Sequence, residues 1–502
     1  MKNKKVVLLI MDGWGLGPED KYNAVANADT PNYDALIRDF PDLSLFSDGE
    51  FVGLPKGQFG TSEINHQVIG TGRVIFQDLP KIDRAIETKM FFQNEKLLEA
   101  VEHVKKNNSA LHLAGIISDG KVHSSVEHVK ALIELAEKHD LKKVYVHAFT
   151  DGRDTPPKSA EKFLREVTNA LKNIKESAIA TIQGRFWLDR DREWEKTDTA
   201  LDLMVDGKGN SITDNWEGVM NFAYNRNETD EFFSQYLLNK KGLIKENDSV
   251  IFFHYRTDRL YQIVKRLKER RIKNLKMTTF IEVSEEFDKV GVAFPRDEVK
   301  HSLAEILSLS GKRQFHITET EKYSHLTYFF NGGRESEYEN EKWELIQSNR
   351  YVKPFYNFEP NMKVFDITKK VIQRIKKGND DFILINFANP DMVGHTGNYE
   401  AALIACESVD YALGKIFEAL KNKLHEYAFL VTADHGNSDQ MWDYENNQPH
   451  TQHTLNPVPF ILVSDYDKRL KKLMGLENIA PTILDLMGLE KPIEMQGESF
   501  LE

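Results

Sequence analysis

The 502-residue sequence has one cysteine, no long apolar run and no excess of positive charge, and each absence excludes a class of protein. A single cysteine, Cys406, cannot form an intrachain disulfide, which excludes a disulfide-stabilised secreted scaffold and fits a reducing compartment. No segment approaches the roughly 20 apolar residues of a transmembrane helix. The 66 Lys and Arg residues against 78 Asp and Glu give a net charge of −12, which argues against broad binding of nucleic acid or anionic lipid.

The N-terminal segment does not have the pattern of a secretory signal. Lys2, Lys4 and Lys5 precede the apolar run Val6–Met11, and Asp12 follows it. The run is shorter than the roughly 7–15 apolar residues of a signal-peptide core. We therefore expect a cytoplasmic protein. We also expect a monomer that acts on a small molecule, with no membrane and no nucleic acid among its partners.

Short apolar runs alternate with helical patterns along the chain, which indicates the α/β class. Several runs are apolar throughout, as in strands that are buried on both faces of a sheet covered by helices. Helical spacing predicts helices over 126–136 and 404–420, and Ser124 with Glu127 predicts a capping box for the first. The predicted strands are Val6–Met11, Leu111–Ile117, Val144–Phe149, Val250–Phe253, Phe382–Phe387 and Phe429–Val431.

Titratable residues follow all six predicted strands. In open α/β sheets, ligands bind outside the carboxyl ends of the strands. An Asp-Gly pair after one strand is usually only a turn, but six such strand ends together predict a binding site. The residues in question are Asp12, Asp119, His123, Asp151, Arg153, Asp154, Arg256, Asp391, His395, Asp434 and His435.

The chemistry of these strand ends changes along the chain, which suggests two domains. Acidic and His-rich ends lie near the N-terminus and beyond Asp391, whereas Arg-rich ends lie between Arg153 and Arg259. We predict that residues 77–307 form a domain inserted into another that residues 1–76 and 308–502 build together. At about 100–200 residues per domain, the chain length allows this organisation.

A set of carboxylates and imidazoles predicts a metal site. Asp391 and His395 are four residues apart, so both would project to one side of a helix. A second Asp-His pair lies at 434–435, and His450 and His453 add two more imidazoles. Such donors suit Mn²⁺, Zn²⁺ or a similar ion better than Ca²⁺, and the absence of Cys ligands argues against structural zinc. Any one His is most simply a surface or packing residue, but metal binding explains them jointly.

Ser62 lies in the stretch Gly57–His66, where Gly, Thr and Ser precede an apolar segment, as in a loop that enters a helix. Backbone amides at a helix N-terminus favour an anion, such as a phosphorylated serine. The alternative is an ordinary N-cap. No Walker-type phosphate loop occurs, which gives nucleotide phosphoryl transfer little support.

Five arginines lie after or beside apolar runs in spite of the negative net charge. The planar guanidinium binds carboxylate and phosphate oxygens in pairs, so this set suits a small polyanion. Two of them, Arg256 and Arg259, are three residues apart and are predicted to share a helix face. The alternative is a set of surface ion pairs, which contribute little stability. The five are Arg153, Arg185, Arg190, Arg256 and Arg259.

Ten stretches, in order and nearly end to end, resemble the cofactor-independent phosphoglycerate mutases of the alkaline phosphatase superfamily. Any one is weak evidence, but their order and spacing are specific. The stretches are Met11–Gly15, Gly57–His66, Ser118–Ser124, Asp151–Asp154, Gly184–Arg185, Arg256–Arg259, Glu319–Tyr323, Asn389–Thr396, Ala433–Asn437 and His450–Thr454.

The resemblance implies two α/β domains, a phosphatase-like domain from both chain ends and an inserted transferase-like domain. It also implies two divalent metal ions, usually Mn²⁺, and no need for 2,3-bisphosphoglycerate. One ion would be held by Asp391, His395 and His453, and the other by Asp12, Ser62, Asp434 and His435. The substrate would be bound by His123, Arg153, Asp154, Arg185, Arg190, Arg256, Arg259 and Lys322.

The implied reaction is the interconversion of 3-phosphoglycerate and 2-phosphoglycerate in glycolysis and gluconeogenesis. Ser62 would carry the phosphoryl group as phosphoserine, Asp154 would donate and accept protons, and Lys322 would contact the phosphate. The segment after Arg185 is one residue shorter than is usual in the family, so either Arg190 or Arg192 fills the following Arg position.

Two other readings of the sequence stay open. One is a metal-dependent phosphatase or another phosphomutase of the same superfamily, and the other is a non-catalytic protein that binds metal and phosphorylated metabolites. The arginine set and Asp154 favour an enzyme that retains glycerate, which a pure hydrolase has less need to do. Ser62 and Asp154 also argue against binding alone, because binding needs neither a nucleophile nor a proton shuttle.

Overall fold

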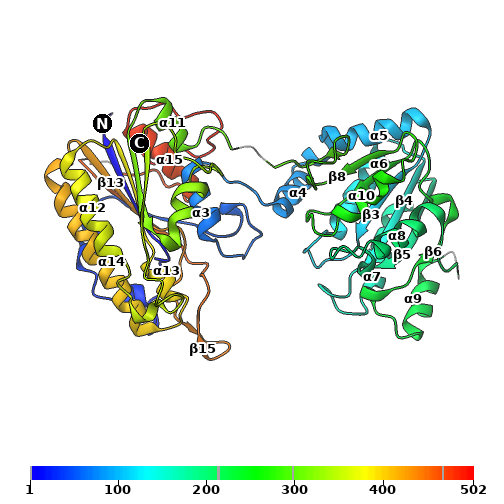
Figure 1. Ribbon diagram of the computed structural model, residues 1–502, viewed down its shortest axis with the longest axis horizontal. Coiled ribbons are helices and arrows are strands. Elements are labelled where there is room, and N and C mark those ends of the chain that lie inside the picture. Colours follow the sequence, from blue (N-terminus) through cyan, green and yellow to red (C-terminus); the bar gives the residue numbers. More distant parts are fainter. Residues whose placement is uncertain (1–2, 212–214, 297–298, 466–468) are drawn as a thin grey trace. The chain divides into compact units, whose positions relative to one another are not determined.

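The computed structural model describes residues 3–211, 215–296, 299–465 and 469–502, and the chain divides into two compact units (Figure 1). Unit 1 is Met1–Gln77 with Glu298–Glu502, and unit 2 is Asp78–Asp297. The domain boundaries predicted from the sequence, at 76/77 and 307/308, lie one residue before the first division and ten residues after the second. The later boundary falls inside α11 (Leu303–Leu309), whose Leu303 and Leu307 are buried in the core of unit 1.

Unit 1 contains a seven-stranded sheet in which only β16 runs antiparallel to its neighbours. The residues of β12 and β13 are all buried, as expected for strands covered on both faces. In sheet order the strands are β11 (Glu341–Ile346), β10 (Gln314–Glu319), β12 (Phe382–Phe387), β1 (Lys5–Met11), β13 (Tyr427–Thr432), β16 (Val458–Val463) and β2 (Asp42–Leu45).

Helices lie on both sides of this sheet (Figure 1). On one side lie α12 (Val364–Lys377) and α14 (Tyr399–Leu420), and on the other lie α3 (Ser62–Thr71), α11 and α15 (Ile479–Leu486). Cys406 is buried on α14 and is a packing residue, as predicted. The unit also contains α1 (Ala24–Asn27), α2 (Pro31–Asp39), α13 (Asn389–Gly394) and a hairpin of β14 (Trp442–Asp443) and β15 (Gln448–Pro449).

Unit 2 contains a second seven-stranded sheet, in which only β6 is antiparallel. Successive side chains of a strand point to opposite faces, so Leu113 packs in one apolar cluster and Ala114 in another. In order the strands are β6 (Tyr236–Leu237), β5 (Glu176–Gly184), β4 (Lys143–Thr150), β3 (Leu111–Ile116), β7 (Ser249–Phe252), β8 (Lys276–Thr279) and β9 (Gly291–Val292).

The helices of unit 2 divide between these clusters. The first cluster contains buried residues of α5 (Glu95–Asn107), α6 (Val126–Lys138), α7 (Ala160–Leu171) and α9 (Trp216–Asn225), together with Ile82 of α4 (Asp78–Glu87). The second contains residues of α8 (Trp194–Leu201) and α10 (Tyr261–Glu269). Both faces of the sheet are therefore covered, as in unit 1.

All six predicted strands are present, within two residues at each end, which confirms the α/β assignment. The predicted capping box at Ser124 is wrong. The cap of α6 is Ser125, whose hydroxyl accepts a hydrogen bond from the backbone N–H of Glu127 at 3.3 Å. The Ser124 hydroxyl instead donates to the carbonyl of Ile116 at 2.6 Å, at the end of β3.

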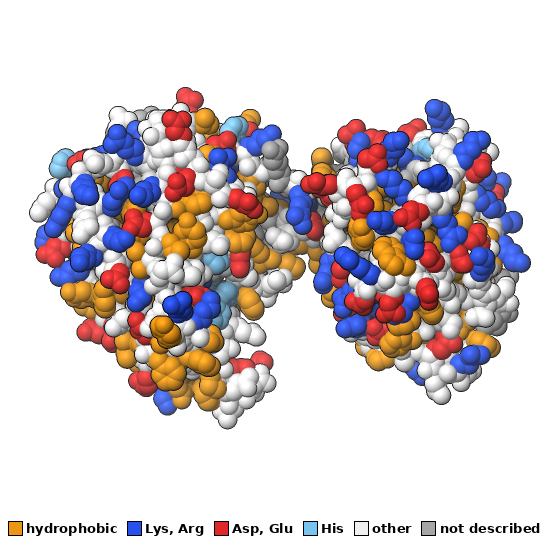
Figure 2. Space-filling view, viewed as in Figure 1, with side chains coloured by type: hydrophobic (Ala, Val, Ile, Leu, Met, Phe, Trp, Pro, Cys, Tyr) orange, Lys and Arg blue, Asp and Glu red, His pale blue; other side chains and the backbone are white. Residues whose placement is uncertain are grey.

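The surface carries charges of both signs. On the face shown in Figure 2, Lys and Arg side chains lie among Asp and Glu side chains in both units. No helix within the described parts of the chain combines the length and the apolar character needed to cross a bilayer.

Candidate active site

Four predicted site residues of unit 1 follow neighbouring parallel strands of its sheet. Asp12 follows β1, Lys322 follows β10, Asp391 lies in α13 after β12, and Asp434 follows β13. Because the carboxyl ends of parallel strands meet at one edge of a sheet, these side chains converge there. All four are buried.

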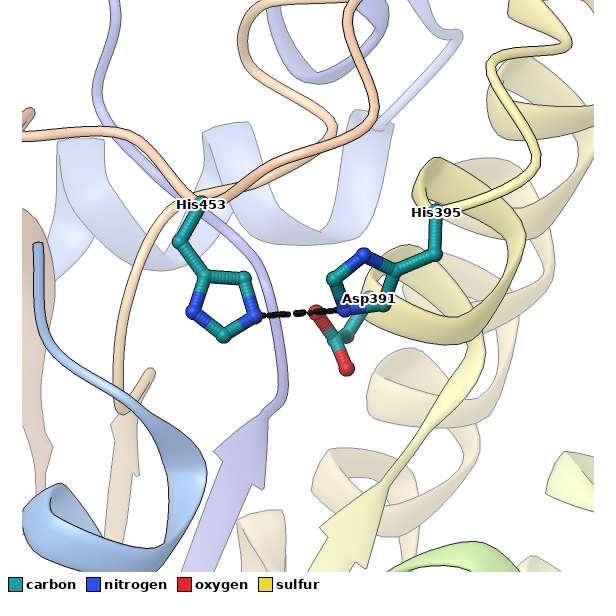
Figure 3. Close-up of side chains that lie close together, drawn as sticks. All are labelled: Asp391, His395 and His453. Carbon is teal, nitrogen blue, oxygen red and sulfur yellow. Dashed lines mark hydrogen bonds and ion pairs between the residues drawn. The ribbon is translucent and has the colours of Figure 1, made fainter. Parts of the chain in front are cut away.

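Asp391, His395 and His453 form a group of donor atoms (Figure 3). Oδ1 of Asp391 lies 3.1 Å from Nε2 of His395 and 3.3 Å from Nε2 of His453. Each Nδ1 lies 2.8 Å from a backbone carbonyl, that of Thr451 for His395 and that of Gly60 for His453. A carbonyl only accepts, so each Nδ1 carries a proton, while both Nε2 atoms face the Asp391 carboxylate and lie 3.2 Å from one another.

A second group surrounds Ser62, the first residue of α3. The hydroxyl oxygen of Ser62 lies 2.8 Å from Nε2 of His435 and 3.3 Å from Oδ1 of Asp12. Oδ2 of Asp434 lies 3.3 Å from the same Nε2. Burial lowers the pKa of His435, which favours the neutral imidazole that can accept the proton of the Ser62 hydroxyl.

Lys322 connects the two groups. Its Nζ lies 2.7 Å from oxygens of Asp12, Ser62 and Asp391. Burial alone would lower the pKa of Lys322, but the negative charges of Asp12, Asp391 and Asp434 raise it above its ordinary value. The same contact works in reverse, because Lys322 holds the pKa of Asp391 well below its ordinary range in spite of burial. The side chain of Lys322 is therefore a cation surrounded by carboxylates.

The donor atoms of unit 1 fit divalent cations. Nitrogen and carboxylate oxygen donors converge in a buried setting, and Oδ2 of Asp434 is buried without a hydrogen-bond partner. Imidazole with carboxylate suits Mn²⁺ or Zn²⁺. Among the residues that the structure describes, three groups have donor atoms within 4.8 Å of one another: Asp391 with His395 and His453, Asp12 with Asp391 and His435, and Asp12 with His66 and Asp434.

In unit 2 the predicted substrate-binding residues follow β3, β4, β5 and β7 at the carboxyl ends of the parallel strands. Arg185 is almost fully buried, and its Nη1 donates to Asp151 at 2.6 Å and also to Asp154. Arg153 is about half exposed and lies 3.4 Å from Glu231. The residues are His123, Arg153, Asp154, Arg185, Arg190, Arg256 and Arg259.

The predicted shared helix face of Arg256 and Arg259 is wrong, because α10 begins only at Tyr261. Arg259 is buried and donates to the carbonyls of Arg185 at 3.1 Å and Leu188 at 2.7 Å. Burial and the nearby charge of Arg185 lower the pKa of Arg259 to about 10. Its Nε and that of Arg185 have no hydrogen-bond partner. Buried N–H donors and positive charge together favour an anionic ligand.

Asp258 lies among these basic residues, and the sequence analysis missed it. Its carboxylate is 3.4 Å from Nδ1 of His123, 3.3 Å from Nη1 of Arg190 and 3.6 Å from Nη2 of Arg256. Burial would raise the pKa of Asp258, but these cations lower it far below its ordinary value. Arg190 thus joins the cluster through Asp258. Arg192 is exposed, and none of the described contacts links it to these residues.

Comparisons with known proteins agree with this geometry. A model of the metalloenzyme superfamily matches residues 4–491. The 2,3-bisphosphoglycerate-independent phosphoglycerate mutases of Clostridium botulinum and Clostridium acetobutylicum are 43% and 44% identical to this chain over 100% of both chains. The chain belongs to this mutase family. It is accordingly an isomerase, as predicted.

A solved structure shows the same relationship. The phosphoglycerate mutase of Leishmania mexicana, crystallised at low cobalt concentration, is 30% identical and has a TM-score of 0.54. The match covers 99% of this chain and 98% of that one. The mutase fold of two α/β domains is thus confirmed.

The sequence analysis also missed two buried polar residues beside the predicted metal-binding residues. His66 lies four residues after Ser62 on α3, and Asn386 lies on β12 next to Asp12. The spacing of Ser62 and His66 places both on one side of a helix and could have indicated His66. No signal in the sequence pointed to Asn386, because it lies inside a predicted apolar strand.

Proposed function

We propose that this chain interconverts 3-phosphoglycerate and 2-phosphoglycerate through a phosphoserine at Ser62, with two divalent ions, Mn²⁺ foremost, and without 2,3-bisphosphoglycerate. The supporting observation is the position of Ser62. Its hydroxyl lies between the imidazole of His435, the carboxylate of Asp12 and the ammonium of Lys322. A glycolytic and gluconeogenic role, a cytoplasmic location and a monomeric state are predictions that accompany this proposal.

The residues of unit 1 would hold the ions in two sets. Asp391, His395 and His453 would hold one, and Asp12, Ser62, Asp434 and His435 the other. When bound, the ions lower the pKa of a serine hydroxyl and offset the charge of phosphoryl oxygens.

Each side chain would then have one part in the phosphoryl transfer. The Ser62 oxygen, once deprotonated, would attack phosphorus as the bond from phosphorus to the 3-oxygen of the substrate breaks, while Lys322 would donate hydrogen bonds to the phosphoryl oxygens. Asp154 donates a proton to the departing glycerate oxygen. Return of the phosphoryl group to the 2-hydroxyl, with Asp154 accepting that proton, forms 2-phosphoglycerate and restores Ser62.

The basic residues of unit 2 retain glycerate between the two transfers. Arg185 and Arg259 each have a buried N–H group that can donate a hydrogen bond to a carboxylate, and Asp154 lies beside Arg185. A hydrolase would release its alcohol and would not need this set. The arrangement therefore favours a mutase over a phosphatase.

Phosphorus NMR of 3-phosphoglycerate with the purified chain and Mn²⁺, without 2,3-bisphosphoglycerate, tests the proposal. We expect a growing 2-phosphoglycerate signal that is absent with Ser62→Ala. Release of inorganic phosphate alone would support the phosphatase reading. An unchanged spectrum with Mn²⁺, Co²⁺ and Zn²⁺ in turn would refute the assignment of the substrate.

A further inference from the structure

Two polar residues with no role in the proposed reaction connect the side chains around Ser62. His66 on α3 and Asn386 on β12 are both fully buried. Nδ2 of Asn386 donates to Oδ2 of Asp12 at 2.7 Å and lies 3.1 Å from Nε2 of His66. Nδ1 of His66 lies 2.9 Å from the carbonyl of Ser62 and 3.3 Å from Oδ2 of Asp434.

These contacts determine which nitrogen of His66 carries the proton. Nδ1 faces two oxygen acceptors, the Ser62 carbonyl and the Asp434 carboxylate, so it must be the donor. Nε2 faces the amide N–H of Asn386 and must accept. The orientation of the Asn386 amide follows from Asp12, because the Asp12 carboxylate only accepts and the amide group that lies 2.7 Å from it must be the NH₂.

The same contacts exclude His66 as a metal ligand in this arrangement. Its donor atoms lie within 4.8 Å of those of Asp12 and Asp434, which would also fit a site of three ligands. A ligating imidazole needs a nitrogen lone pair directed at the ion. The Nδ1 of His66 is protonated and its Nε2 is occupied by Asn386, so neither nitrogen is free to bind one.

We infer that His66 and Asn386 are a positioning pair for the second metal-binding set. Asn386 orients Asp12, and through Nε2 it keeps the proton of His66 on Nδ1. That N–H is hydrogen-bonded to the carbonyl of Ser62 in the first turn of α3, and Nδ1 also lies 3.3 Å from Oδ2 of Asp434. The pair thus contacts three of the four residues that would hold this ion. The inference rests on the metal sites of the proposed function.

Paired substitutions separate this role from a merely structural one. His66→Asn keeps an N–H near the position of Nδ1, whereas His66→Gln keeps a polar atom near Nε2 and loses the Nδ1 donor. Asn386→Leu removes the amide at similar volume. His316→Asn is the matched control. His316 is as deeply buried in unit 1 and its Nδ1 faces the carbonyl of Leu326 at 3.0 Å, but none of its described contacts is with a predicted ligand.

The readout is the dissociation constant for Mn²⁺, measured on the full chain by electron paramagnetic resonance of free Mn²⁺. A His453→Ala background weakens the Asp391 set and isolates the second site. We expect His66→Gln and Asn386→Leu to weaken this site about 10–100-fold, the usual effect of losing a residue that orients a ligand. His66→Asn should recover most of the affinity, and His316→Asn should leave it unchanged.

Each outcome decides between explanations. Wild-type affinity in both His66→Gln and Asn386→Leu would overturn the inference, as would equal affinity of His66→Asn and His66→Gln. If His66→Gln does not fold, Asn386→Leu and His66→Asn still give the comparison. A wild-type chain that binds no Mn²⁺ would instead refute the proposed metal sites, whereas normal wild-type binding with unaffected variants would refute only the positioning pair.

Discussion

The ammonium nitrogen of Lys322 lies 2.7 Å from the hydroxyl oxygen of Ser62, although the two residues are 260 positions apart in the chain. The same nitrogen contacts Asp12 and Asp391, one from each predicted metal-binding set. A buried ammonium is costly unless it is paired, and here carboxylates on two sides pair it. Lys322 therefore places a positive charge at the hydroxyl of Ser62, the proposed nucleophile.

Replacing Lys322 by Met should reduce kcat about 10²–10³-fold, the usual loss when one group that stabilises transition-state charge is removed. Metal content should not fall, because Lys322 is not a ligand and repels cations. Steady-state kinetics with metal analysis checks both. Lys342→Met, at an exposed position on β11, is the control. A Lys322→Met enzyme with wild-type kcat would remove Lys322 from the mechanism.

The His453→Ala variant should bind one metal ion fewer than the wild type. His453 supplies one of the three donor atoms in the group that it forms with Asp391 and His395, and two protein ligands hold such an ion poorly. Metal per chain after dialysis, measured by mass spectrometry, provides the test. His450→Ala, three residues earlier and outside the three donor groups, should keep its metal. Full occupancy in the His453 variant would show that His453 is not a ligand.

Asp154→Asn should slow isomerisation about 10²–10⁴-fold, the contribution of one general acid or base. The asparagine still accepts a hydrogen bond from Arg185, so thermal stability and metal content should stay close to those of the wild type. Asp288→Asn, at an exposed residue of the same unit that is paired with Lys268, is the control. Normal turnover by the Asp154 variant would assign the proton transfers to another group.

The sequence predicted six strands, three in each seven-stranded sheet, because their apolar runs are buried on both faces. The site residues that follow those strands could be predicted for the same reason. Asp12, Asp391 and Asp434 needed only the rule that parallel strands end at one edge. The approach of Lys322 to Ser62, by contrast, depends on tertiary packing between α3 and the segment after β10.

Other features could not be predicted, because they depend on competition between local hydrogen bonds. Ser124 and Ser125 are equally good caps by sequence, and the carbonyl of Ile116 decides between them by accepting the hydroxyl of Ser124. Asp258 reads as an ordinary turn residue between two arginines. Only the fold shows that Arg190 and His123 also contact it.

Glu319 should make the stability of unit 1 fall as the pH rises. This buried residue ends β10, where the hydroxyl of Ser348 donates to it at 2.8 Å and the backbone N–H of Lys363 at 3.3 Å. Burial is the main cause that raises the pKa of Glu319 from 4.5 to about 7, and nearby Glu321 adds to it. The folded state therefore binds the proton more tightly than the unfolded state.

Below pH 4.5 both states are protonated and Glu319 carries no penalty, whereas above pH 7 the folded state must bury the charge. The difference of about 2.5 pH units corresponds to roughly 3 kcal/mol lost between these limits.

Glu319→Gln, which resembles the protonated acid, should lack this loss. Urea unfolding at pH 5 and pH 8 measures the free energy of unfolding of both proteins. Relative to the wild type, the variant should be more stable at pH 8 than at pH 5. Glu335→Gln, at an exposed carboxylate of the same unit, should follow the wild type at both. Parallel pH dependence of the Glu319 variant and the wild type would mean that Glu319 is already ionised in the folded state.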